Sequence, residues 1–118
     1  MNYGEKRKFP RLNISVDIVY TKLPTADKPK LSQSKNISKG GICLIVYEQL
    51  QVSDLLELKI FLPEYEKPIN ATGKIAWLKE FVIESSTKSK RFDVGIEFAK
   101  VSNKDKQRID KYIFSFNK

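Results

Sequence analysis

The sequence predicts a mostly β protein, an antiparallel barrel or sandwich of six strands followed by one helix. Four of the six stretches alternate apolar and polar residues in the way that is typical of half-buried strands. Turn-forming residues separate them, and the sequence in between lacks the helical spacing that would indicate parallel crossovers. Only the end of the chain changes to the periodicity of an amphipathic helix.

The first three predicted strands cover residues 14–22, 31–37 and 42–47. The first has apolar side chains at every second position, and a loop at 24–29 follows it. The second is more polar and leads into a glycine-containing turn at 36–41. The third is apolar on both faces, so we expect it to lie centrally or beneath a covering element.

The last three predicted strands cover residues 56–62, 69–77 and 92–98. Each alternates apolar with polar residues, and Pro63 ends the first of them. Residues 85–90 are rich in serine and lysine and are expected to form a flexible connection before the last strand.

Four residues within these strands have simple structural interpretations. We expect Trp77 to belong to the core, and Cys43 to be a small buried apolar residue. Gly73 and Gly95 are expected where the β structure bends or forms a bulge.

The end of the chain predicts an amphipathic helix over residues 102–117. Ser102 suits the N-cap, and Asp105 lies at the capping-box distance from it. The apolar stripe that follows consists of Ile109, Tyr112, Ile113 and Phe116. We expect this stripe to cover an open end or side of the β structure.

Composition indicates a single soluble domain. The chain has 118 residues, of which 41% are hydrophobic and 31% charged, enough for a core without a metal or disulfide. We expect no membrane span and no secretion signal, because no apolar run is long enough and the amino terminus has no signal-like pattern. The single cysteine, Cys43, fits a reducing compartment, so we expect a cytoplasmic protein.

The sequence offers little support for an enzyme. It has no histidine, no recognisable carboxylate pair, no nucleophile elbow and no phosphate-binding loop. Without histidine and with one cysteine, it cannot form a tetrahedral zinc site of the usual kind. We therefore expect neither catalytic residues nor a metal.

Two short segments are the candidates for a binding site. The first contains Arg7 and Arg11 beside Pro10, in a chain with a net charge of +8. Their guanidinium groups can bind phosphates bidentately or stack on flat rings. The second, residues 36–41, is an Asx/Ser turn that ends in two glycines, which admit positive φ and allow close approach to the backbone.

Connectivity predicts that these two segments meet. If strands 14–22, 31–37 and 42–47 form a meander, the chain enters the first strand at the end where the 36–41 turn lies. The arginine segment and the turn would then share one rim of the β structure. A purely structural role for the polar turn residues is the alternative.

Arg-x-x-x-Arg at 7–11 and Asn-x-Ser-x-x-Gly at 36–41 closely resemble the signature of the PilZ domain, a family of bacterial receptors for cyclic di-GMP. Segments 73–77 and 93–98 are also similar to later strands of that family. The resemblance covers nearly the whole chain, residues 1–118, as a single domain. It implies three parts: a flexible basic arm over 1–13, a six-stranded antiparallel split barrel over 14–99 and a helix over 102–117.

The resemblance implies cyclic di-GMP as the ligand and no other cofactor. The arginines would bind phosphates and guanine, while the turn would line a guanine pocket. Asn36 stands where the family usually has Asp, so a neutral amide would meet guanine N1–H and N2–H₂. The implied ligand-binding residues are Arg7, Arg11, Asn36, Ser38, Gly40 and Gly41, with Lys6 and Lys8 as candidates for additional phosphate contacts.

By the same resemblance the protein would be an adaptor, a monomer or weak dimer, that contacts a separate downstream protein. Motility, adhesion and exopolysaccharide control are the processes it implies. Binding would order residues 5–11, with Phe9 and Leu12 tethering the arm beforehand. A basic β-barrel that binds nucleic acid through aromatics such as Tyr3 or Phe81 is a less favoured alternative. A PilZ-like module that acts without ligand is another.

Overall fold

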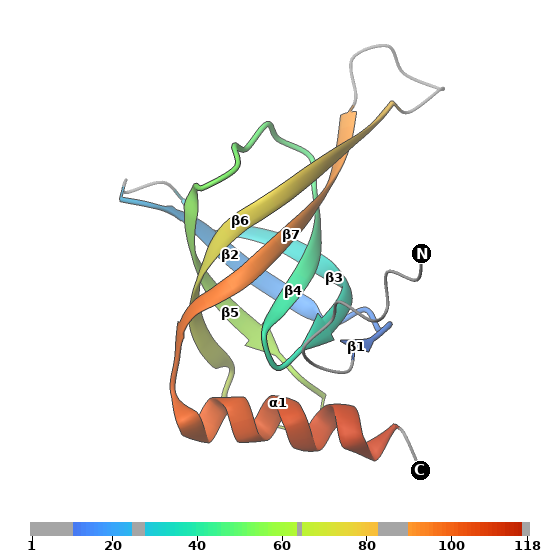
Figure 1. The fold of residues 1–118 in the computed structure, drawn as a ribbon, viewed down its shortest axis with the longest axis vertical. Coiled ribbons are helices and arrows are strands. Elements are labelled where there is room, and N and C mark those ends of the chain that lie inside the picture. The colour runs from blue at the N-terminus through green and yellow to red at the C-terminus, as the bar shows by residue number, and fades with distance from the viewer. Residues whose placement is uncertain (1–10, 25–27, 64, 83–89, 117–118) are drawn as a thin grey trace, which may run out of the picture.

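The structure of the protein, a computed structural model, describes residues 11–24, 28–63, 65–82 and 90–116. Within these ranges, seven strands are followed by one helix (Figure 1). The elements in chain order are β1 (Arg11–Leu12), β2 (Asp17–Leu23), β3 (Lys30–Ser38), β4 (Gly41–Val46), β5 (Leu55–Phe61), β6 (Ile69–Val82), β7 (Lys90–Val101) and α1 (Asn103–Ser115).

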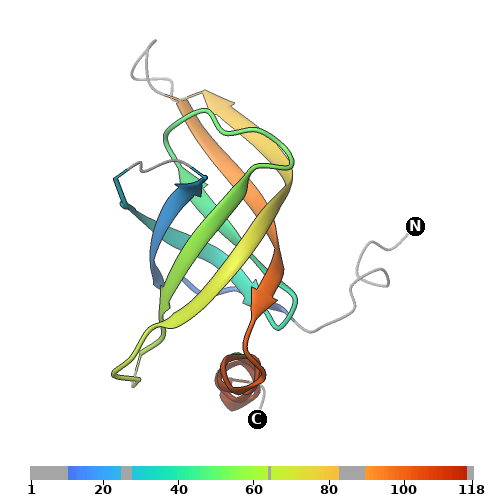
Figure 2. The same ribbon diagram turned by 90° about the vertical axis from the view of Figure 1, so that its left-hand side faces the viewer.

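Six of the strands close into a barrel in which neighbouring strands are antiparallel. Around the wall the order is β3-β2-β5-β6-β7-β4, and the pairing of β4 with β3 completes the ring. Figures 1 and 2 show these strands wrapped around a common interior, with α1 across one end. The barrel, and not the sandwich, is therefore formed, and the six predicted strands correspond to β2–β7.

β1 lies on the same edge of β3 as β2 does, so it extends the barrel wall. Arg11 is the Cα partner of Ser38, and the neighbouring Leu12 packs against the core. The end of the predicted 1–13 arm is therefore part of the wall, which agrees with the tethering role expected for Leu12. Phe9 and the arm around it lie outside the described residues.

A buried serine holds the wall together between β1 and β2, where the strand is interrupted. The Ser34 hydroxyl donates to the Ile14 carbonyl (2.7 Å) and accepts from the Val16 amide (3.0 Å). The Ser34 amide in turn donates to the Val16 carbonyl (3.0 Å). These bonds satisfy buried backbone groups that no regular ladder reaches. The strand predicted over 14–22 therefore begins later than expected, because β2 starts at Asp17.

Alternate residues of the strands point into the barrel and form one continuous apolar core. β5 shows the pattern most clearly, because Leu56, Leu58 and Ile60 are fully buried between exposed neighbours. β4 is at least half-buried along its whole length, as its apolar sequence predicts.

α1 covers one end of the barrel (Figure 2) and begins at the predicted cap. Ser102 is the N-cap, and its hydroxyl accepts from the Asp105 amide at 3.1 Å. The residues buried by the helix are Ile109, Tyr112 and Ile113. Phe116, the fourth predicted member of the stripe, is instead exposed at the C-cap, where its ring meets that of Tyr112 edge-on.

β6 and β7 are longer than the strands predicted at 69–77 and 92–98. β5 pairs with β6 only over residues 69–74, so the outer parts of β6 and β7 pair with each other and project from the barrel (Figure 1). Side chains there, such as Lys79 and Glu80, are exposed at consecutive positions. The burial alternation on which the prediction depended is therefore missing from this hairpin.

Candidate ligand-binding site

A cavity of about 670 Å³ lies beside the β3–β4 turn, and its size is typical of small-molecule sites. Its lining comes from five strands, β1, β3, β4, β6 and β7, and from α1. Five of the predicted site residues line it: Arg11, Asn36, Ser38, Gly40 and Gly41. The fold thus brings together residues that lie far apart in the chain.

Arg11 reaches the cavity because β1 pairs with the end of β3. Its Cα partner, Ser38, is the residue at which the turn begins, and Arg11 itself is exposed. The predicted meeting of the arginine segment with the turn is therefore confirmed for Arg11. Arg7, together with Lys6 and Lys8, lies outside the described residues.

The Ser38 side chain organises the β3–β4 turn. Its hydroxyl accepts from the amides of Gly40 and Gly41, both at 3.2 Å, and lies 3.4 Å from the Gly41 carbonyl, to which it donates. The Gly40 carbonyl accepts from the Phe98 amide (2.9 Å), which ties the turn to β7. A serine turn of this kind needs no ligand, so the structural role left open by the sequence is present.

Gly41 is required by a close approach and not by its backbone conformation. Gly40 and Gly41 could both adopt positive φ, but no glycine in the described part of the chain does so. A Cβ on Gly41 would lie 2.2 Å from the Ile96 carbonyl oxygen of β7. The missing side chain lets β4 and β7 pair closely beside the cavity.

Asn36 lies next to an irregularity in the β3–β4 pairing. The register shifts between Ser34 and Asn36, so that Asn36 is opposite Cys43. The Asn36 residue is half-buried and lines the cavity. Within the described part of the chain its side chain makes no hydrogen bond, and the amide is therefore available to a ligand.

Cys43 forms part of the cavity wall and is buried, as predicted. Burial raises the pKa of the Cys43 thiol, and the nearby Asp93 carboxylate raises it further. The thiol is therefore protonated at neutral pH and contributes a small neutral surface to the site.

Trp77 also lines the cavity, and the prediction that it belongs to the core is wrong. The β6–β7 register shifts between Ile75 and Trp77, which breaks the alternation and leaves Trp77 45% exposed opposite Gly95. The indole lies over Gly95, where a Cβ would be 2.1 Å from Trp77 Nε1. A second register shift at Gly73 agrees with the bulge expected there.

The cavity lining carries more positive than negative charge. Its cations are Arg11, Lys39, Lys74 and Lys106, and among the described residues its acidic member is Glu97. Sequence reasoning missed Lys74, which has the pattern of a solvent-facing strand residue, and Lys106, which lies on the polar side of the helix. Only the packed barrel brings both to one site, and the charge excess suits an anion.

The described lining residues offer guanidinium and ammonium groups, an amide, a hydroxyl and an indole ring, a set that suits binding of a flat anionic molecule. In the ranges that the structure describes, no three His, Cys, Asp or Glu side chains gather in a way that could hold a metal. Nor does that part of the chain contain a helix long and apolar enough to span a bilayer.

The sequence matches the family model of the PilZ domain over residues 5–115. The chain belongs to the PilZ domain family. Four residues of the two motifs that resemble this family line the cavity: Arg11, Asn36, Ser38 and Gly41. No curated protein sequence gives a significant match to this PilZ domain.

Several solved structures share the fold of this PilZ domain. The Bacillus subtilis inhibitor of motility, MotI/DgrA, has a TM-score of 0.73 at 22% identity, covering 95% of this chain and 51% of that one. The PilZ domain of Escherichia coli YcgR, solved with c-di-GMP, gives 0.73 at 14% identity, with coverages of 95% and 92%. The complex of K. pneumonia MrkH with c-di-GMP gives 0.71 at 20% identity, with coverages of 95% and 52%. This PilZ domain therefore spans about half the length of the MotI and MrkH chains.

Proposed function

We propose that this PilZ domain is a receptor for cyclic di-GMP without catalytic activity of its own. The observation that carries the proposal is the pairing of Arg11 with Ser38 at a cavity of about 670 Å³. This pairing brings Arg11, one residue of the first family motif, to the turn that contains the second, and the excess of cations suits a ligand with two phosphates. The YcgR and MrkH structures that contain c-di-GMP support the same ligand.

The two phosphates would pair with the cations of the cavity. Arg11 can donate two parallel hydrogen bonds to one phosphate, a geometry that guanidinium favours. Arg7 from the arm would act in the same way, and Lys74 and Lys106 offer further ammonium donors. Each charge-assisted hydrogen bond contributes roughly 1.5–3 kcal/mol. A few of them therefore account for micromolar affinity, about 8 kcal/mol.

The guanine bases would bind between the turn and the indole. The Asn36 amide oxygen can accept from guanine N1–H or N2–H₂. Trp77 offers an exposed ring face, and stacking of this kind is worth about 1–3 kcal/mol per base. Gly40 lines the cavity without a side chain, so a base can approach the turn closely.

Ligand binding would order the arm that precedes β1. Ordering costs about 1–2 kcal/mol per residue, which favours a short ordered segment. Leu12 already packs against the core and Arg11 is already paired in β1, so only the part of the arm around Arg7 has to close over the ligand. The closed arm would present a changed surface, and that change is the proposed signal.

A separate protein would bind this surface, so the PilZ domain would act as an adaptor. We expect it in the cytoplasm, as a monomer or weak dimer. MotI is named an inhibitor of motility, and MrkH is described as a c-di-GMP-dependent transcription regulatory factor. The description of MotI supports a role in motility, while adhesion and exopolysaccharide control are the other processes that the family resemblance implies. A pull-down with and without cyclic di-GMP, using the wild-type chain, identifies the partner by its dependence on ligand.

Calorimetric titration with cyclic di-GMP tests the proposed function. We expect saturable binding in the micromolar range or tighter. GMP has one phosphate and one base, so it loses part of the contacts and should bind at least about tenfold more weakly, a difference of about 1.4 kcal/mol. No heat change at tens of micromolar would overturn the receptor proposal and favour an adaptor that acts without ligand.

Salt dependence separates this proposal from nucleic-acid binding. Lys79 Nζ lies 5.3 Å, and Arg91 Cζ 5.1 Å, from the centroid of the half-buried Phe81 ring. This arrangement would also suit stacked bases. A protein that spans many phosphates loses affinity steeply with salt, with a slope of about −0.9 per phosphate on duplex DNA. We expect the shallow slope of a ligand with two phosphates and no saturable binding of an oligonucleotide.

A further inference from the structure

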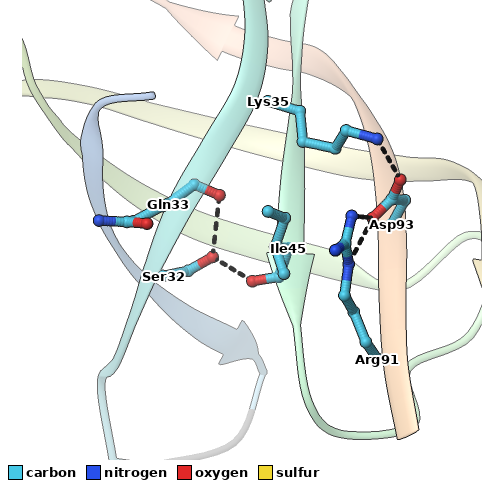
Figure 3. A network of polar contacts seen from close by, with 6 residues as sticks. All are labelled: Ser32, Gln33, Lys35, Ile45, Arg91 and Asp93. Carbon is cyan, nitrogen blue, oxygen red and sulfur yellow. Dashed lines mark hydrogen bonds and ion pairs between the residues drawn. The ribbon is translucent and has the colours of Figure 1, made fainter. Parts of the chain in front are cut away.

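A lysine of β3 reaches across β4 to a buried carboxylate of β7 (Figure 3). Lys35 Nζ donates to Asp93 Oδ2 at 2.7 Å, and the Asp93 side chain is only 5% exposed. Arg91 donates to the other carboxylate oxygen through Nε (3.3 Å) and through Nη2 (3.1 Å). Two cations on different strands therefore converge on one buried anion.

The need to balance the charge of Asp93 does not by itself explain why Lys35 pairs with it. Arg91 already pairs with Asp93, and both residues belong to β7. A buried carboxylate that keeps one such partner is not left uncompensated. What Lys35 adds is a link between strands, since it joins β3 to β7 over the strand that contains Ile45, the Cα partner of Asp93.

Lys35 is also the extra residue of a β-bulge. Ser34 is opposite Leu44 and Asn36 is opposite Cys43, so Lys35 has no partner of its own in the β3–β4 ladder. A slip of one residue in a strand moves its side chains to the opposite face. Because Asn36 follows Lys35 directly, the direction of its side chain depends on where the bulge is held.

We propose that the Lys35–Asp93 ion pair holds this bulge in place and thereby directs Asn36 toward a guanine in the cavity. Lys35 is then a positioning residue, which agrees with its absence from the cavity lining while Asn36 is part of it. The inference rests on the proposed cyclic di-GMP function and adds a determinant of base selectivity to it.

The predicted consequence is selectivity between guanine and adenine. Guanine offers its N1–H and N2–H₂ donors to an amide oxygen, whereas adenine has no donor at these two positions. A correctly directed Asn36 therefore favours cyclic di-GMP over cyclic di-AMP, which carries the same two phosphates. A misdirected Asn36 loses this preference, while pairing of the phosphates with Arg11 is unchanged.

The experiment compares the affinities of the full chain for cyclic di-GMP and cyclic di-AMP by calorimetry. Lys35→Met removes the ion pair, and Lys79→Met is a matched control. Lys79 is the Cα partner of Asp93 from the other neighbouring strand, β6, but in the described part of the chain it forms no ion pair with Asp93. We expect Lys35→Met to lower the ratio of the two affinities about tenfold, the value of one neutral hydrogen bond. Lys79→Met should leave this ratio unchanged, and Lys35→Arg should restore it.

Melting curves of each variant accompany the titrations, with Lys35→Gln as the second variant if Lys35→Met does not fold. An affinity ratio in the folded Lys35 variant equal to that of the wild type would overturn the positioning role. A wild type that binds both cyclic dinucleotides equally would overturn the selectivity assigned to Asn36 but not the receptor function. A wild type that binds neither would overturn the proposed function, and this inference with it.

Discussion

Arg11 lies directly opposite Ser38 in the β1–β3 ladder, at a cavity that both residues line. Because strand pairing already orders the arginine backbone, only its side chain has to be immobilised when an anion binds. The serine in turn holds the amides of Gly40 and Gly41. Arg11, the last residue of the first motif, thus meets the turn that contains the second motif.

Arg11→Ala is expected to lower the affinity for cyclic di-GMP by about 10- to 150-fold, because it removes a charge-assisted pair worth roughly 1.5–3 kcal/mol. The side chain is exposed, so the free energy of unfolding should change by no more than about 0.5 kcal/mol. Calorimetry and urea denaturation measure the two quantities. Lys59→Ala removes an exposed charge on β5 that does not line the cavity, and it should leave the affinity unchanged. An equal loss in both variants would contradict a specific phosphate contact.

Trp77 provides a spectroscopic reporter, since it is the single tryptophan of the chain. Stacking of a guanine on the exposed indole should quench or shift its emission when cyclic di-GMP is added. Trp77→Ala should weaken binding by about 5- to 150-fold, the equivalent of about 1–3 kcal/mol per stacked base. Tyr47→Ala, which removes an exposed aromatic residue outside the cavity, is the control. Saturating ligand that leaves the emission unchanged would argue against stacking on Trp77.

Two glycines beside the cavity should respond differently to a methyl group. Gly41→Ala would place its Cβ 2.2 Å from the Ile96 backbone oxygen, which cannot move without disturbing the β4–β7 ladder. We expect the free energy of unfolding to fall by about 1–3 kcal/mol or more. Gly95→Ala would instead collide with the Trp77 indole, a partly exposed side chain that can rotate away. The stability of Gly95→Ala should therefore fall less than that of Gly41→Ala, while its affinity for cyclic di-GMP should fall as much as that of Trp77→Ala.

Urea denaturation and calorimetry on both glycine variants separate these effects. A Gly41→Ala variant as stable as the wild type would show that β4 and β7 can move apart at this point. A Gly95→Ala variant that keeps full affinity would show that the position of the indole does not matter for binding.

Much of the barrel could be predicted from local patterns. β5 is recognisable because one face of it is buried and the other exposed, and α1 begins where Ser102 caps it. Register shifts, in contrast, cannot be recognised from the pattern of residues in a strand. The shift before Trp77 inserts one residue without altering the composition of the strand, so a side chain assigned to the core emerges at the cavity. The outer hairpin of β6 and β7 was missed for a related reason, because its residues are exposed at consecutive positions.

Some residues of the candidate site could likewise be predicted from the sequence, and others could not. The pairing of Arg11 with the 36–41 turn follows from connectivity alone, because an antiparallel meander returns the chain to the end it started from. The contributions of Lys74 and Lys106 depend on how β6 and α1 are placed around the turn. Nothing in the spacing of these lysines distinguishes them from the other lysines of a basic chain.

These two lysines yield the last prediction. Lys74→Gln and Lys106→Gln should each weaken cyclic di-GMP binding by roughly 2- to 10-fold at low salt, because each removes a cation from the wall of the cavity. Lys106 is less exposed than Lys74, so its interaction with a phosphate is less screened by water and its loss should be larger. Salt shortens the screening length from about 10 Å at 0.1 M to about 3 Å at 1 M, and the effect of both variants should shrink accordingly. Calorimetry at the two salt concentrations measures this.

Lys104→Gln is the matched control for Lys106→Gln. It removes the same charge from the same helix, two positions away, but Lys104 is exposed and does not line the cavity. If Lys106 acts through net charge alone, the two variants will lose affinity equally and with the same salt dependence. A larger loss in Lys106→Gln that persists in part at 1 M salt would identify a direct phosphate contact from α1. At this salt concentration the screening length is about 3 Å, so only charges in direct contact still attract each other strongly.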